Sequence, residues 1–270
     1  MRAMNRKNMA CNKEWGDIIE SMAQIEEFID DFCILIFGRD NIICKQYVFA
    51  MQNILRSSKM TLETIKDCCK CFCMADANTL LRKYRDDLFF CLYLIVYDAN
   101  RKLKFLENHK RMECNIEKWC VNSLTNLNIG EVLKDIGASP DVKSAVKEYK
   151  LQESFKEIGD KLNDYVHGNG YDCYNKNICL CKRKEVSEQL NEVLYHEKYI
   201  TVTFLFLLIL CSPLFVMATD YVDFLENGQI PPENSQYWVA PFVKDFLKNN
   251  IALIDENCYR YLCNNSCMFL

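Results

Sequence analysis

The chain has 270 residues, half of them hydrophobic, and a formal charge of −4 at neutral pH. This acidic balance excludes a general electrostatic attraction to nucleic acid or to anionic lipid, so either kind of binding needs a local basic patch. With only 8 Gly and 5 Pro, the sequence has few of the turn residues that many short strands require, and it predicts an all-α fold.

Cysteine usage favours a reducing compartment. The chain holds 17 Cys, an odd number, and it has enough apolar residues to build a core without disulfides. Acidic side chains interrupt every apolar stretch in the first thirty residues, where a signal peptide needs an uninterrupted one. We therefore expect no secretory signal.

The N-terminal part of the chain predicts three helices. Apolar residues recur at steps of three and four from Trp15 to Phe37, which is typical of an amphipathic helix, and Gly38 supplies its stop. Two further helices are expected over residues 42–55 and 61–74, with Thr61 as the N-cap of the second.

A longer helix is expected to open at Asp76. It is apolar on all faces between Leu88 and Tyr97, a stretch too short to span a bilayer, which predicts a central core helix. Shorter helices follow over residues 115–127, 129–136 and 139–149, the last beginning with an N-cap Ser and a Pro at the first helical position.

The C-terminal half contains the most apolar helix. A helix is expected from Gln152 to His167, capped by Gly168, and a loop is expected over residues 170–184. An uninterrupted helical pattern then covers residues 185–227, and the last helix is expected over residues 241–257. We interpret residues 1–270 as a single helical domain, a multi-helix bundle with one long, very hydrophobic helix near the C-terminus.

Residues 200–218 form a run of nineteen without a charge, close to the roughly 20 needed to cross a bilayer in a helix. One hypothesis is a single-pass membrane protein. Basic residues precede the run and acidic ones follow it, which predicts a cytoplasmic N-terminal part. The other hypothesis is the buried axis of a cytoplasmic bundle. It is favoured by Ser212 and Pro213, because a lone span has no neighbours to satisfy the carbonyl that Pro frees.

The segment around His167 carries the strongest candidate for chemistry. Asp160, Asn163 and Asp164 share its side of the predicted helix, away from the apolar face. A simple interpretation is that His167 caps the helix C-terminus, where the dipole favours a cation.

The spacing of Lys161, Asn163 and His167 also resembles the motif of the HEPN proteins. These are helical bundles, many of them ribonucleases in toxin and anti-phage systems, with Arg followed four to six residues later by His near a helix end. The resemblance implies that His167 is the acid/base, that Lys161 contacts phosphate, and that a homodimer brings two sites together on RNA. Lys lacks the planar fork of Arg, so Arg82 or Arg85 of another helix is the candidate for the missing guanidinium.

Two groups of cysteines raise the question of a metal. Cys68 and Cys71 form a C-x-x-C without a second pair, and the spacing of the other group matches no zinc module. We expect these thiols to be small buried hydrophobes, and we expect no metal and no cofactor. The other group comprises His167, Cys173, Cys179 and Cys181.

Two functional predictions remain open. The first is a membrane-associated helical protein without catalytic activity that acts through contacts with a partner protein. The alternative is a soluble HEPN-like effector of bacterial or phage origin that acts on RNA.

Overall fold

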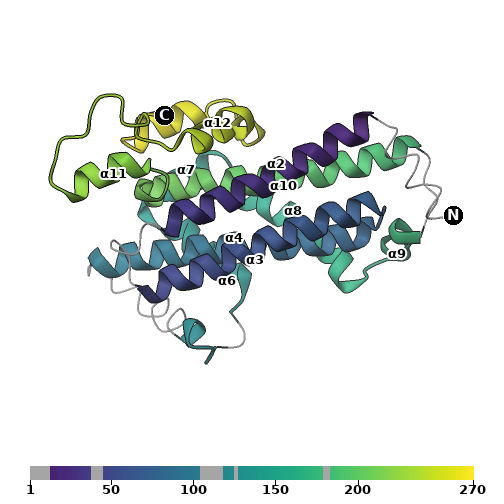
Figure 1. The fold of residues 1–270 in the computed structure, drawn as a ribbon. Coiled ribbons are helices and arrows are strands. Elements are labelled where there is room, and N and C mark those ends of the chain that lie inside the picture. Colours follow the sequence, from purple (N-terminus) through teal and green to yellow (C-terminus); the bar gives the residue numbers. More distant parts are fainter. Residues whose placement is uncertain (1–12, 38–44, 104–117, 125–126, 179–182) are drawn as a thin grey trace.

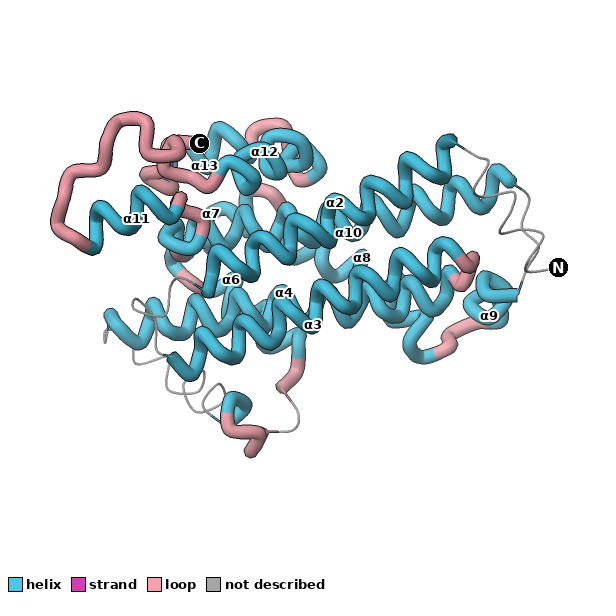
Figure 2. The backbone as a smooth tube through the Cα atoms, in the orientation of Figure 1, coloured by secondary structure: helices cyan, strands magenta, loops and turns pink. Residues whose placement is uncertain are grey.

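The structure, a computed structural model, describes residues 13–37, 45–103, 118–124, 127–178 and 183–270. Its long elements are α helices, and a long loop over residues 227–240 joins α11 to α12 (Figure 2). In chain order they are α2 (Lys13–Phe37), α3 (Lys45–Lys70), α4 (Met74–Leu103), α6 (Ile129–Ala138), α7 (Pro140–Glu148), α8 (Leu151–His167), α9 (Tyr171–Ile178), α10 (Arg183–Cys211), η2 (Pro213–Phe215), α11 (Thr219–Glu226), α12 (Pro241–Asn250), η3 (Ile251–Leu253) and α13 (Cys258–Asn265). Over the described ranges the only β pairing is one antiparallel bridge, between Met217 and Val239. The prediction of an all-α multi-helix bundle is confirmed.

Helices α2, α3, α4 and α10 form the centre of the molecule (Figure 1). α2 and α10 run parallel, as two contacts show. Ser187 near the start of α10 donates to Glu14 near the start of α2. Further along both helices, Phe204 of α10 meets Phe32 of α2, with ring centroids 5.9 Å apart. α6 and α8 pack against α4, while α7, α12 and α13 contact α10. The helices thus surround α10 and the buried half of α4.

Helix α10 is enclosed by protein over most of its apolar length. Every side chain from Ile200 to Ile209 is at most 1% exposed. The segment Glu185–Cys211 is long and apolar enough to cross a membrane, by length and composition alone, and 83% of its most apolar window is buried inside the protein. Two buried hydroxyls within it are satisfied locally, since Thr201 and Thr203 donate to backbone carbonyls one turn earlier.

The prediction of one continuous helix over residues 185–227 is wrong. α10 ends at Cys211, and the chain continues through the short η2 turn into the separate helix α11. Pro213 explains the break, because it lacks an N–H and disfavours the helical conformation for the preceding residue. That residue, Ser212, has φ −159° and ψ 86°, outside the helical region. The apolar run of residues 200–218 therefore spans a helix, a 3-10 turn and the bridge to Val239.

Three other boundaries differ from the prediction. Residues 42–55 and 61–74 were expected as two helices, but α3 is continuous, and the Thr61 hydroxyl donates to Ser57 O one turn earlier instead of capping a new helix. The expected loop 170–184 contains α9, held by Asn177, which accepts a hydrogen bond from the Ala75 N–H at 2.9 Å. The expected helix 241–257 ends as an α helix at Asn250.

Predictions for α2, α8 and the apolar part of α4 agree with the structure. α2 and α8 have the expected extents, and Gly168 takes the left-handed conformation at the end of α8, with φ 61° and ψ 34°. The core position of the apolar part of α4 is confirmed, since Leu88 is fully buried and Val96 is 2% exposed. Gly38, and parts of the helices expected over 42–55 and 115–127, lie outside the described residues.

Candidate functional site

The three residues predicted from the His167 segment lie on α8 but do not share one surface. Lys161 and Asn163 are two residues apart, which places them about 200° apart around a helix. Lys161 is exposed, with its Nζ 3.9 Å from Glu157 Oε1. Asn163 instead lines a cavity between α4, α6 and α8. His167 is exposed on the last turn of α8, one turn beyond Asn163.

The structure brings one of the two candidate arginines to α8. Arg85 is 3% exposed, and its Nε and Nη2 donate to Asp86 Oδ1 at 2.9 and 2.7 Å. Its Nη1 rests against Gly159, where an added Cβ would lie only 2.5 Å away. Gly159 precedes His167 by eight residues, or about 12 Å along a helix. Arg85 therefore joins Asn163 in lining the cavity, and it does not join His167.

The predicted cysteine groups show no metal geometry where the structure describes them. The described residues contain no set of three or more His, Cys, Asp or Glu side chains that could hold a metal ion. Cys173, on α9, donates to the Asp164 carbonyl of α8 at 3.6 Å. Cys179 and Cys181 lie outside the described residues.

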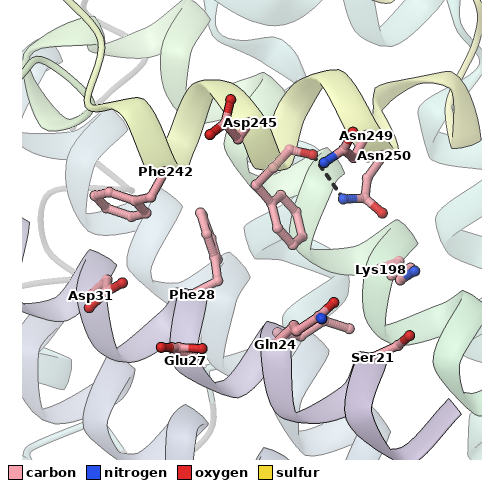
Figure 3. A pocket seen from close by; sticks show the side chains of 12 residues that line it. Ser21, Gln24, Glu27, Phe28, Asp31, Lys198, Phe242, Asp245, Asn249 and Asn250 are labelled. Atoms are coloured by element: carbon pink, nitrogen blue, oxygen red, sulfur yellow. Dashed lines mark hydrogen bonds between the residues drawn. The ribbon is translucent and has the colours of Figure 1, made fainter. Parts of the chain in front are cut away.

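A groove between α2 and α12 combines accessible aromatic rings with charge (Figure 3). Its volume is about 400 Å³. The ring of Phe28 on α2 stacks on that of Phe246 on α12, with centroids 4.2 Å apart and planes inclined by 24°, and its centroid lies 5.6 Å from that of Phe242. Phe28 is 5% exposed, whereas Phe242 and Phe246 are half-buried and present their rings to the groove.

Local sequence explains why α12 presents these rings. Pro241 occupies the first helical position, where its missing N–H breaks no hydrogen bond. Val243 and Leu247 form the fully buried face, so Phe242 and Phe246, one position before each, fall beside it toward α2. The Asn250 side chain closes the helix by donating to Phe246 O at 2.8 Å.

The rim of the groove is acidic. Glu27 and Asp31 of α2 and Asp245 of α12 line it, together with the single cation Lys198 of α10. No ion pair reaches these three carboxylates within the described part of the chain, and all three residues are exposed. The groove therefore carries a net negative charge above an aromatic floor.

The acidic residues on the other side of α2 are neutralised. Glu26 pairs with Lys66, and Asp30 lies 3.4 Å from the Nζ of Lys59, both on α3. The exposed row on the groove side continues toward the start of α2 with Asp17 and Glu20. The fold thus pairs one set of α2 carboxylates internally and leaves the other set facing solvent.

Two buried titratable groups lie on α10. Glu197 is fully buried, and neither carboxylate oxygen has a hydrogen-bond partner among the described residues. Burial raises the pKa of Glu197 well above its ordinary value, against the opposing effect of the nearby Lys66 ammonium. His196 is 4% exposed, and burial lowers its pKa. Burial therefore favours the neutral form of both side chains.

Comparison of the chain with family models, curated proteins and solved structures gave no significant match. The HEPN resemblance of Lys161, Asn163 and His167 therefore stays a prediction.

The sequence alone does not reveal the aromatic groove. Its signal is present but divided between the two ends of the chain. Phe242 and Phe246 recur at a step of four in one helix, and the exposed acidic row of α2 recurs over four turns. Only the packing of α12 against α2 shows that these two patterns belong to one surface.

Proposed function

We propose that the protein acts by binding a basic, amphipathic segment of a partner protein in the groove between α2 and α12. The observation that carries the proposal is the combination of an aromatic floor with three exposed carboxylates that have no ion-pair partner in the described chain. This develops the prediction of a protein that works through protein contacts and names the chemistry of the contact.

The two parts of the groove have different roles in this proposal. Half-buried aromatic rings supply most of the binding free energy in helix-in-groove complexes, since they are large, rigid and partly desolvated before binding. Each exposed charge pair contributes only about 0.2–1 kcal/mol, and its main effects are faster association and rejection of acidic partners. Lys and Arg side chains can also rest on the ring faces of Phe242 or Phe246.

A short amphipathic helical peptide of Leu and Lys tests the proposal by fluorescence anisotropy. We expect it to bind about tenfold tighter than the same peptide with Glu in place of Lys, and to weaken as salt rises. Phe246→Ala is expected to weaken binding by about 2 kcal/mol, because it removes a central aromatic anchor. The double variant Glu27→Lys/Asp31→Lys should reverse the preference between the two peptides.

The matched control is Glu63→Lys, which reverses one exposed charge on α3 outside the groove. It should leave the affinity for the Lys peptide within about twofold of the wild type, since only distant charge changes. Equal affinity for the Lys and Glu peptides in the wild-type protein would contradict the proposal.

For localisation, we favour the cytoplasmic alternative, in which α10 is the axis of the bundle. The burial of residues 200–209 by other helices supports this choice. Single-pass anchoring with a cytoplasmic N-terminal part would require the side chains that contact α2 and α4 to face lipid instead.

The second candidate function is an RNA-acting effector. The observation that favours it is the placement of Arg85 against α8 on the side of Asn163. Under this hypothesis a homodimer would have to bring His167 of one chain to the guanidinium of the other, since about two helical turns separate them in one chain.

RNA cleavage by the purified protein without added metal tests this second function. His167→Ala is expected to lower the rate by about a hundredfold or more, which is typical of the loss of an acid/base group. Lys161→Gln should weaken RNA binding with a smaller effect on the rate. Cleavage that persists unchanged in His167→Ala would exclude the proposed site.

A further inference from the structure

The cavity between α4, α6 and α8 is separate from the groove and has the opposite charge. Its volume is about 610 Å³, within the usual range for small-molecule sites, and α7 and α10 complete its walls. It is lined by the cations Arg85, Lys134 and Lys156 and by a single carboxylate, that of Asp160. The whole chain has a charge of −4, so this concentration of cations is local.

The cavity has an apolar end. α4 and α8 run antiparallel, and Phe89 of α4 meets Phe155 of α8. The ring centroids lie 4.6 Å apart and the ring planes are inclined by 78°, an edge-to-face arrangement. Leu207 of α10 lines the same cavity. All three side chains are at most 5% exposed. A ligand that reaches this end must be apolar there.

The other end is polar. One turn before Phe89 on α4, Arg85 directs Nη1 toward Gly159, while its Nε and Nη2 are held by Asp86. The absence of a side chain at Gly159 makes room for the guanidinium, because a Cβ there would be only 2.5 Å from Nη1. Asn163 lies one turn further along α8, and its buried Oδ1 has no hydrogen-bond partner in the described chain. An amide with an unused polar atom can serve a ligand through either of its groups.

The mouth adds charge of the same sign. Lys134 of α6 and Lys156 of α8 are exposed, line the cavity, and have no ion pair among the described residues. Asp86 already compensates the charge of Arg85, so these two lysines leave the site positive even with Asp160 present.

We infer that this cavity binds an amphipathic anion, an alkyl chain that ends in a carboxylate or a phosphate. The alkyl chain lies against the wall formed by Phe89, Phe155 and Leu207, and the anionic head lies at the Arg85 end, within the field of Lys134 and Lys156. This site does not depend on the α2–α12 groove, and it goes beyond the proposed function.

Isothermal titration of the full chain with dodecanoate, dodecyl phosphate and dodecanol tests the inference, because the three share one tail and differ in the head. Both anions are expected to bind about tenfold tighter than the alcohol. Tight binding of dodecanoate but not of dodecyl phosphate would identify a fatty carboxylate as the ligand class. Tight binding of dodecyl phosphate but not of dodecanoate would identify a phosphate monoester. Dodecanol that binds as tightly as both anions would overturn the inference.

Two variants separate the role of charge from that of the fold. Lys134→Gln/Lys156→Gln should weaken dodecanoate binding by about tenfold and leave dodecanol unchanged. The matched control, Lys143→Gln/Lys147→Gln, removes two exposed lysines of α7 that do not line the cavity, and should change neither. Leu133→Trp, at the half-buried edge of the cavity, should abolish binding of all three ligands while circular dichroism stays helical. Unchanged dodecanoate affinity in the lysine variant or in Leu133→Trp would overturn the inference.

Discussion

Replacing Phe204 with alanine is expected to lower the free energy of unfolding by about 3–5 kcal/mol, the cost of emptying a fully packed aromatic site. Phe204 lies in the middle of the buried part of α10 and is fully buried. Its ring meets Phe32 of α2 edge to face, with centroids 5.9 Å apart and planes at 81°. This loss follows only if protein, and not lipid, surrounds α10.

Urea unfolding of Phe204→Ala, Phe32→Ala and the double variant measures whether the two rings interact. We expect a coupling free energy of about 0.5–1.5 kcal/mol, as found for aromatic pairs beyond their buried area. The control Phe49→Ala changes a ring on α3 that is 63% exposed, and it should alter stability by less than about 0.5 kcal/mol. A protein that needs detergent for extraction and shows no coupling between Phe32 and Phe204 would contradict the bundle-axis proposal and favour the single membrane span.

Replacing Glu197 with glutamine is expected to raise stability at neutral pH by up to about 3 kcal/mol and to flatten its dependence on pH. The carboxyl of Glu197 is fully buried, so its pKa in the folded protein is raised well above the ordinary value of 4.5. Between the pKa of the unfolded chain and that of the folded protein, folding therefore takes up a proton that the unfolded chain has released. Glutamine has a similar shape and needs no proton.

The direction of the pH effect follows from the raised pKa. The folded state binds more protons than the unfolded state, so the wild-type protein is most stable below about pH 4.5 with respect to this group. Its stability falls by about 1.4 kcal/mol per pH unit as the pH rises toward the pKa of the folded state. Chemical unfolding of the wild type and Glu197→Gln at several pH values measures the difference. The control Glu63→Gln replaces an exposed carboxyl of α3, and should retain the wild-type slope. An identical slope in Glu197→Gln would contradict the assignment.

Local patterns were sufficient for several helices and insufficient for others. The step of three and four in α2 and the left-handed Gly168 after α8 follow from residues near in sequence, and both were predicted. The Thr61 hydroxyl can cap the start of a helix, and it can also donate to a carbonyl one turn earlier in a continuous helix. Local sequence therefore does not decide between one helix and two at this position. α9 depends on contacts of Asn177 with residues about a hundred positions earlier, which no local pattern encodes.

The candidate sites depended even more on distant residues. Asn163 was selected from sequence and does line a cavity, but its neighbour there is Arg85 and not His167. That neighbour is set by the antiparallel packing of α4 on α8 and by the missing side chain of Gly159. The groove likewise joins residues near position 28 to residues near position 246.

The amino-acid sequence by itself determined the all-α class, the extents of α2 and α8 and the apolar character of residues 200–218, because these depend on composition and on periodicity within one helix. Only the tertiary structure decided what covers α10 and which carboxylates of α2 are neutralised. The reason is physical: an apolar side chain gains the same free energy on leaving water for lipid or for a neighbouring helix, and a charge is compensated only by the residue that packing places beside it.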